Sequence, residues 1–134
     1  TILRRILKMA QTKCKMQILI DNMERVIEEF KIEFGIDSVI TNKQYDYQRF
    51  FYHGIEIGCY FRDGITIAKK IVFYEGRFWG NNSVNHTPKN NYEGFKNEVY
   101  SSIKKIMPNV IEVEKALKEW KEKRMMESIK DDFV

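Results

Sequence analysis

Two carboxylates and one guanidinium near tight turns are the residues whose types come closest to a catalytic site. Asp63 and Glu75 each precede a glycine, and Arg77 follows the second of these turns. Two carboxylates and a cation can hold Mg²⁺ and a phosphate. Charged residues are commonplace at turns, however, and the sequence has no glycine-rich phosphate loop, nucleophile elbow, Cys-x-x-Cys or His-x-x-x-His motif. We therefore expect no catalytic residues and no enzymatic activity.

The two cysteines, Cys14 and Cys59, and the two histidines, His53 and His86, show no spacing typical of metal ligands. We expect reduced, partly buried thiols in a reducing compartment, the cytoplasm. Because His53 precedes Gly54, we interpret it as a turn residue that tolerates a left-handed backbone rather than as a general base. The sequence therefore predicts no metal and no cofactor.

Charge is unevenly distributed along the first forty residues. The formal net charge is +4, yet residues 1–20 carry five cations and no acid, while residues 21–40 carry six acids and two cations. Cations near a helix N-terminus oppose the helix macrodipole, so local helix stability does not explain this arrangement. The sequence favours residues that have A/T-rich codons, and lysine is one of them. The number of lysines is therefore raised independently of function. The five cations, predicted to contact a partner, are Arg4, Arg5, Lys8, Lys13 and Lys15.

Two interpretations of this basic segment stay open. In the first, the cations contact nucleic-acid phosphates or an acidic protein. In the second, they form a solvated face or lie beside an acidic stretch of an antiparallel neighbour, as in a homodimer that pairs basic ends with acidic ends. Phosphate binding would weaken steeply with salt, whereas an apolar helix seam would respond little.

A second candidate surface is the sheet face that points away from the helices. Alternating apolar residues on two strands are expected to face the helices, namely Ile55, Ile57, Ile65, Ile67, Ile71 and Phe73. The opposite face then combines aromatic, basic and apolar residues, which are Tyr60, Arg62, Lys70, Val72, Tyr74, Arg77 and Trp79. Aromatics beside cations are typical of single-stranded nucleic-acid binding. Such aromatics also mark protein interfaces and stabilise ordinary sheet faces.

A long N-terminal helix must carry the five cations. Apolar residues recur every three or four positions from residue 2 to residue 34, with Lys13 as the one break, and Gly35 is placed to end the helix. Unbroken, this helix is about 50 Å long, which exceeds the diameter of a domain of this size. Either it breaks near Asp21, or residues 1–20 project as a basic helical arm. An arm with an apolar stripe needs a partner.

Three glycine turns predict a β-meander in the middle of the chain. His53-Gly54, Asp63-Gly64 and Glu75-Gly76 mark hairpins between strands at residues 45–52, 55–62 and 65–74 and a short strand at 77–80. An additional edge strand is expected around residues 38–41. Residues 81–90, rich in asparagine, are expected to form a polar loop.

The C-terminal third is predicted to be helical. Asn90 and Glu93 resemble a capping box, and Asn109 with Glu112 offers a second cap directly after Pro108. The apolar stripe nevertheless continues in phase past Pro108. The sequence therefore predicts two helices, or one that is kinked at Pro108.

Together these patterns predict one α+β domain over residues 1–134. It has a long N-terminal helix, an antiparallel β-meander of three to four strands, and two C-terminal helices (or one kinked at Pro108) packed on one sheet face. No apolar run reaches the length of a membrane span, so we expect no membrane partner. We expect a non-enzymatic macromolecule-binding protein with a protein partner or a homodimer. The alternatives are a nucleic-acid-binding protein and a small inhibitor or accessory factor that docks on a larger enzyme.

Overall fold

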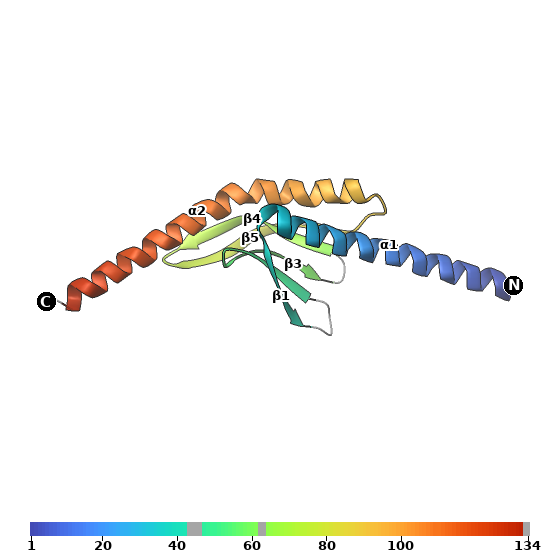
Figure 1. The fold of residues 1–134 in the computed structure, drawn as a ribbon, viewed down its shortest axis with the longest axis horizontal. Helices are drawn as coiled ribbons and strands as arrows, with labels where there is room; N and C mark the ends of the chain where they lie inside the picture. Colours follow the sequence, from blue (N-terminus) through green and yellow to red (C-terminus); the bar gives the residue numbers. More distant parts are fainter. Residues whose placement is uncertain (43–46, 62–63, 133–134) are drawn as a thin grey trace.

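The computed structural model describes residues 1–42, 47–61 and 64–132, and for residues 10–13 it describes the backbone alone. Helix α1 (Ile2–Phe34) and helix α2 (Tyr92–Asp132) flank a five-stranded antiparallel sheet in the chain. Both helices cover the same face of this sheet (Figure 1). The α+β meander is confirmed. In sheet order, the strands are β1 (Asp37–Asn42), β2 (Tyr47–Tyr52), β3 (Ile55–Phe61), β4 (Gly64–Tyr74) and β5 (Arg77–His86).

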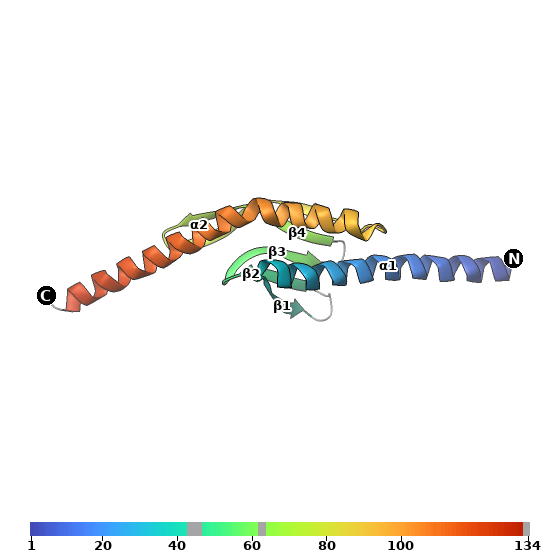
Figure 2. The ribbon, with the colours of Figure 1, turned by 45° about the horizontal axis from the view of Figure 1, so that its top comes forward.

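Helix α1 is continuous, so the predicted break near Asp21 is wrong. It ends where predicted, because Gly35 adopts a left-handed φ of 66° and the Ile36 amide donates a hydrogen bond of 3.0 Å to the Lys31 carbonyl. This pattern satisfies carbonyl groups at the helix end. The first half of α1 extends beyond the sheet, whereas the second half lies against it (Figures 1 and 2).

The sheet has five strands, so the prediction of three to four is wrong. The expected edge strand forms as β1 and pairs with β2. The last strand does not stop at Gly80, since β5 pairs with β4 along its whole length and places His86 opposite Ile65. Most of the predicted polar loop is therefore strand. The sequence did not reveal this part of β5, because its asparagines are exposed and periodicity indicates a strand only where one face is apolar.

Two hairpin turns follow the predicted glycine pairs. His53 and Gly54 have φ values of 47° and 83°, and Glu75 and Gly76 have values of 48° and 80°. Positive φ at both positions is typical of the tight turn that matches the twist of paired strands. Gly76 has a second role, because a Cβ there would lie 2.5 Å from the ring of Trp120 in α2. Of the remaining predicted turn, Asp63-Gly64, Asp63 lies outside the described part of the chain, and Gly64 begins β4.

The C-terminal segment is one helix that contains Pro108, which is the second of the two predicted alternatives. Its N-cap is Asn91, one residue later than predicted, and the Asn91 side-chain oxygen accepts a hydrogen bond of 3.2 Å from the Gly94 amide. Pro108 lies inside α2, which changes direction along its length (Figures 1 and 2). Proline removes one helical hydrogen bond and crowds the preceding turn, which accounts for a bend.

The core lies between the helices and the sheet. In α1, Phe30 packs edge-on against Phe50 of β2 with ring centroids 4.9 Å apart, and both rings are fully buried. Helix α2 covers the middle of β4 with a stripe of buried residues that begins at Tyr92 and ends at Val113. The isoleucines of β3 and β4 fill the space beneath. Phe73, predicted to face the helices, is packed against this core.

Candidate functional site

The first candidate site is the arm, defined as residues 1–20, which comprise the N-cap Thr1 and the first part of α1. The apolar stripe of α1 is almost fully buried at Met23, Ile27 and Phe30, whose exposed fractions are 4% or less. On the arm the same stripe is exposed by 40–77% at Ile2, Ile6, Met9, Met16 and Ile20. Leu3, Leu7 and Ile18 widen the exposed apolar surface. Burying large apolar side chains is favourable, so this surface is suited to contact with a partner.

The predicted cations lie on the same arm. Arg4, Arg5, Lys8 and Lys15 are exposed, while the side chain of Lys13 lies outside the described part. The next turns of α1 expose acids instead, at Asp21, Glu24 and Glu28. One helix therefore presents a basic apolar half and an acidic half along its exposed surface.

A groove lies where the arm meets the globule. It measures about 390 Å³ and is lined by Ile20, Glu24, Ile27, Glu28, Gln48 and Tyr60. Ile20 and Ile27 belong to the stripe of α1, while Gln48 and Tyr60 are cross-strand partners on β2 and β3. The exposed stripe of the arm thus leads directly into a groove with two carboxylates at its border.

Tyr60 was predicted on the sheet face away from the helices, and that placement is wrong. The pairing of β2 with β3 shifts register after Phe50, which lies opposite Gly58, whereas Phe51 lies opposite Glu56. Ile57 is the extra residue of this bulge. A bulge shifts the alternation of the strand by one residue, and so it turns Tyr60 toward α1 and Cys59 toward the opposite face.

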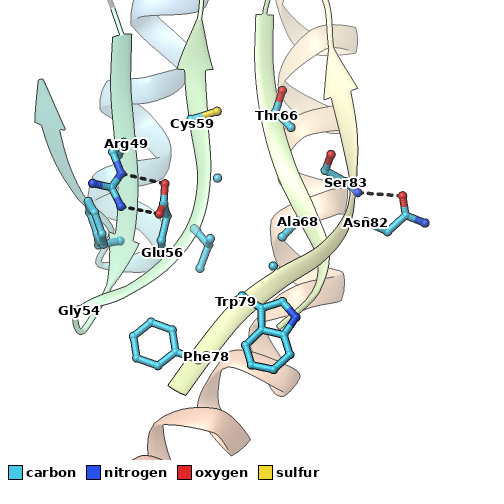
Figure 3. A pocket seen from close by; sticks show the side chains of 14 residues that line it. Arg49, Gly54, Glu56, Cys59, Thr66, Ala68, Phe78, Trp79, Asn82 and Ser83 are labelled. Carbon is cyan, nitrogen blue, oxygen red and sulfur yellow. Dashed lines mark hydrogen bonds and ion pairs between the residues drawn. The ribbon is translucent and has the colours of Figure 1, made fainter. Parts of the chain in front are cut away.

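The second candidate site is a hollow of about 550 Å³ on the sheet face away from the helices (Figure 3). It lies between the β2–β3 hairpin and the β4–β5 hairpin. At one side the Arg49 guanidinium donates hydrogen bonds of 3.0 and 2.7 Å to the two carboxylate oxygens of Glu56. On β5, Phe78 and Trp79 border the other side, and Trp79 is half exposed. Burial raises the pKa of the Cys59 thiol, which also borders the hollow.

The remaining predicted residues of this face lie along the β4–β5 hairpin. Lys70 pairs with Asn81, Val72 with Trp79, and Tyr74 with Arg77, and cross-strand partners share one face. Their placement away from the helices is therefore as predicted. Arg62 lies outside the described residues. Of the predicted set, Trp79 borders the hollow, whereas Lys70, Tyr74 and Arg77 do not. Arg49, Glu56 and Phe51 of the hollow carried no sequence signal, because a hairpin bulge brings them there.

A polar cluster joins α1 to α2 near the core. The carboxylate of Glu29 accepts hydrogen bonds from the Tyr92 hydroxyl and from Arg25 Nε at 3.0 Å, and Lys96 Nζ lies 2.9 Å away. The Tyr92 hydroxyl, followed by Lys96 and Arg25, lowers the pKa of Glu29 from 4.5 to about 2. The Asn22 side chain also donates hydrogen bonds to the carbonyls of Lys89 and Asn90. These contacts fix the direction in which the arm leaves the globule.

His86 is the one buried polar or charged side chain among the described residues. Its Nε2 lies 2.6 Å from the Ser102 hydroxyl of α2. Burial lowers the pKa of His86 from 6.5, with Lys89 acting in the same direction and Glu98 opposing it. The buried ring is thus held in its neutral form between the sheet and α2.

Lowering the pH is expected to destabilise the fold through His86. The unfolded chain takes up a proton at this imidazole near pH 6.5, whereas the folded chain resists it. The unfolded state therefore binds more protons, and the free energy of unfolding falls as the pH drops from about 6.5 toward the lower folded pKa. Urea unfolding at about pH 7.5 and about pH 5.5 measures this loss. The His86→Gln variant should lose most of the difference; an unchanged pH dependence in that variant would refute the assignment.

The predicted carboxylate pair has no support from the described geometry. Asp63 lies outside the described residues, and Glu75 and Arg77 flank Gly76 at the exposed tip of the β4–β5 hairpin. Gly64 and Glu75 are separated by the whole length of β4, about 35 Å at the rise of an extended strand. Within the described ranges, no three His, Cys, Asp or Glu side chains converge in a metal-binding group. No helix in those ranges has both the length and the apolarity to cross a membrane.

Comparisons with known proteins supply no family for this chain. A scan of protein-family models found no match, and searches of curated proteins and of solved structures found no significant similarity. Any assignment of function therefore rests on the geometry of the arm, the groove and the sheet face.

Proposed function

We propose that this chain is a non-enzymatic binding protein that holds a protein partner on the apolar stripe of the arm. The observation that carries this proposal is the contrast within one helix, in which the stripe is buried at Met23, Ile27 and Phe30 and exposed at Ile2, Ile6, Met9, Met16 and Ile20. Burial of each such side chain is worth about 1.5–3 kcal/mol. A partner helix that covers several of them gains enough to offset the loss of freedom on binding. The cations beside the stripe favour an acidic partner.

The second candidate is nucleic-acid binding, which the exposed Lys70, Tyr74, Arg77 and Trp79 favour. The arm and these residues do not form one continuous basic surface, however. The tip of the β4–β5 hairpin packs against Trp120 in the second half of α2, toward the end of the molecule opposite the arm (Figure 1). A strand of nucleic acid would have to cross the whole sheet to contact both. This separation favours the protein partner.

Two matched variants of the full chain test the class of partner. The stripe variant carries Ile6→Gln, Met9→Gln and Met16→Gln, and the charge variant carries Arg4→Gln, Arg5→Gln and Lys15→Gln. Capture from lysate of the source cells, with and without nuclease treatment, is compared at about 50 mM and about 500 mM salt. We expect a stoichiometric protein partner that survives nuclease and high salt and is lost with the stripe variant. Retention by the stripe variant would contradict the proposal, and loss upon nuclease treatment would favour nucleic acid.

Two further aspects of the proposal follow from the same surfaces. We also propose a cytoplasmic location, which the free thiols of Cys14 and Cys59 support, because such thiols persist in a reducing compartment. A small inhibitor or accessory factor is the special case in which the protein partner is an enzyme. In that case, the enzyme captured through the stripe should have a different activity when it is bound to the arm.

A further inference from the structure

The exposed stripe, the charges beside it and the groove at its base lie on one helix. We propose that the partner of the arm is a second copy of this chain, with the two α1 helices antiparallel and the N-terminal residues of each copy in the groove of the other. This inference rests on the proposed function and names the partner. It explains three features together, namely an apolar stripe that continues into a groove, a basic half of α1, and an acidic half beside that groove.

The spacing of the stripe sets the register of the two helices. Apolar positions alternate by four and three residues along α1, as in packed helices whose side chains interdigitate. In an antiparallel pair, one such register places Met9 of each copy opposite Ile20 of the other. Both residues are exposed on the arm. From there, Ile6 and Ile2 continue toward the groove, where Ile20 and Tyr60 offer apolar contact.

The same register lays the basic half of each α1 along the acidic half of the other. Arg5 of one copy is then level with Glu24 of the other, and Lys8 is level with Asp21, so the attraction acts between the two halves rather than through direct ion pairs. These four residues are exposed in the single chain. Glu28, which also borders the groove, lies 3.5 Å from Lys31 and keeps most of its side chain exposed to a second cation such as Arg4. A parallel pair would instead align five cations with five cations, which is unfavourable.

An antiparallel pair also closes on itself. Each copy gives the same arm and the same groove, so one twofold axis provides both arms with the same contacts. The two globules then lie at opposite ends of the paired helices, because the arm extends away from the sheet (Figure 2). The open sheet face with its hollow stays accessible in both copies, since it points away from α1.

The mass of the full chain in solution tests this inference directly. Light scattering at about 50 µM should give twice the chain mass of 16.1 kDa. The stripe variant with Ile6→Gln, Met9→Gln and Met16→Gln should raise the dissociation constant of the dimer by more than about 100-fold, because each substitution occurs twice in a symmetric interface. Ile32→Gln is the control, since Ile32 is 85% exposed on α1 beyond the paired segment. Circular dichroism confirms that each variant keeps its helices.

A charge swap tests the antiparallel register. Arg4→Glu with Arg5→Glu should weaken the dimer by about 10-fold or more, and so should Glu24→Lys with Glu28→Lys. Combining the four substitutions should restore most of the affinity, because each acidic arm then meets a basic groove. A dimer without this rescue overturns the register.

A chain that stays monomeric at about 50 mM salt overturns the second-copy inference. Stripe-dependent capture of another protein would still support the proposed function, whereas a monomer that captures nothing would sink both.

Discussion

Replacing Phe30 with alanine is expected to lower the free energy of unfolding by about 3–5 kcal/mol, the largest effect of any single substitution considered. Phe30 is fully buried and packs edge-on against Phe50 with centroids 4.9 Å apart. Alanine removes the whole ring and leaves a cavity between α1 and β2. Both neighbours belong to regular elements, so the site cannot collapse freely onto the smaller side chain.

The same helix offers a matched control for this prediction. Ile32 lies two residues from Phe30 but is 85% exposed, so Ile32→Ala should change stability by less than about 0.5 kcal/mol. Urea unfolding monitored by tryptophan fluorescence and by circular dichroism gives both values. Equal, small losses for the two variants would contradict the packing of α1 on the sheet. In that case, the second half of the stripe would not be buried by the sheet, and it would no longer differ from the exposed stripe of the arm.

The sequence alone predicted the helices because their signals are local. The apolar spacing of α1 and the left-handed residue at Gly35 depend on the chain within a few residues. The turns at Gly54 and Gly76 are local in the same sense. The arm follows from length, since a helix of 33 residues is longer than the sheet it covers. This half of the candidate site was therefore accessible without coordinates.

The remaining features depend on contacts between distant segments. The bulge at Ile57 reverses the direction of Tyr60 and Cys59, and its position is set by pairing with β2. β5 continues through an asparagine-rich stretch because β4 supplies hydrogen bonds along its length. Pro108 stays inside α2 because the stripe on both sides of it, from Ile106 to Val110, packs on one core. Tertiary packing outweighed the local signals in all three cases.

Asn109 shows the same effect at one residue, and its replacement gives the second-largest expected loss. The sequence predicted Asn109 as the cap of a new helix, but it lies inside α2, and its side chain contacts β4 instead. Its Oδ1 accepts a hydrogen bond of 2.6 Å from the Ile71 amide, and its Nδ2 donates one of 3.1 Å to the Ile71 carbonyl. The paired residues of β3 and β4 begin at Gly58 and Ile67, so β3 gives Ile71 no partner. The amide of Asn109 therefore takes the place of a neighbouring strand.

Asn109→Ala is expected to lower the free energy of unfolding by about 2 kcal/mol, because two backbone groups in a partly buried site lose their partners. Asn97→Ala is the control, since Asn97 is exposed on the same helix. Alanine favours helix more than asparagine does, so the control should be neutral or stabilised by about 0.5 kcal/mol. Hydrogen exchange of the Ile71 amide should accelerate in the first variant and stay unchanged in the second. If the two variants are equally stable, Asn109 does not support β4, and the sheet must hold its shape at Ile71 without help from α2.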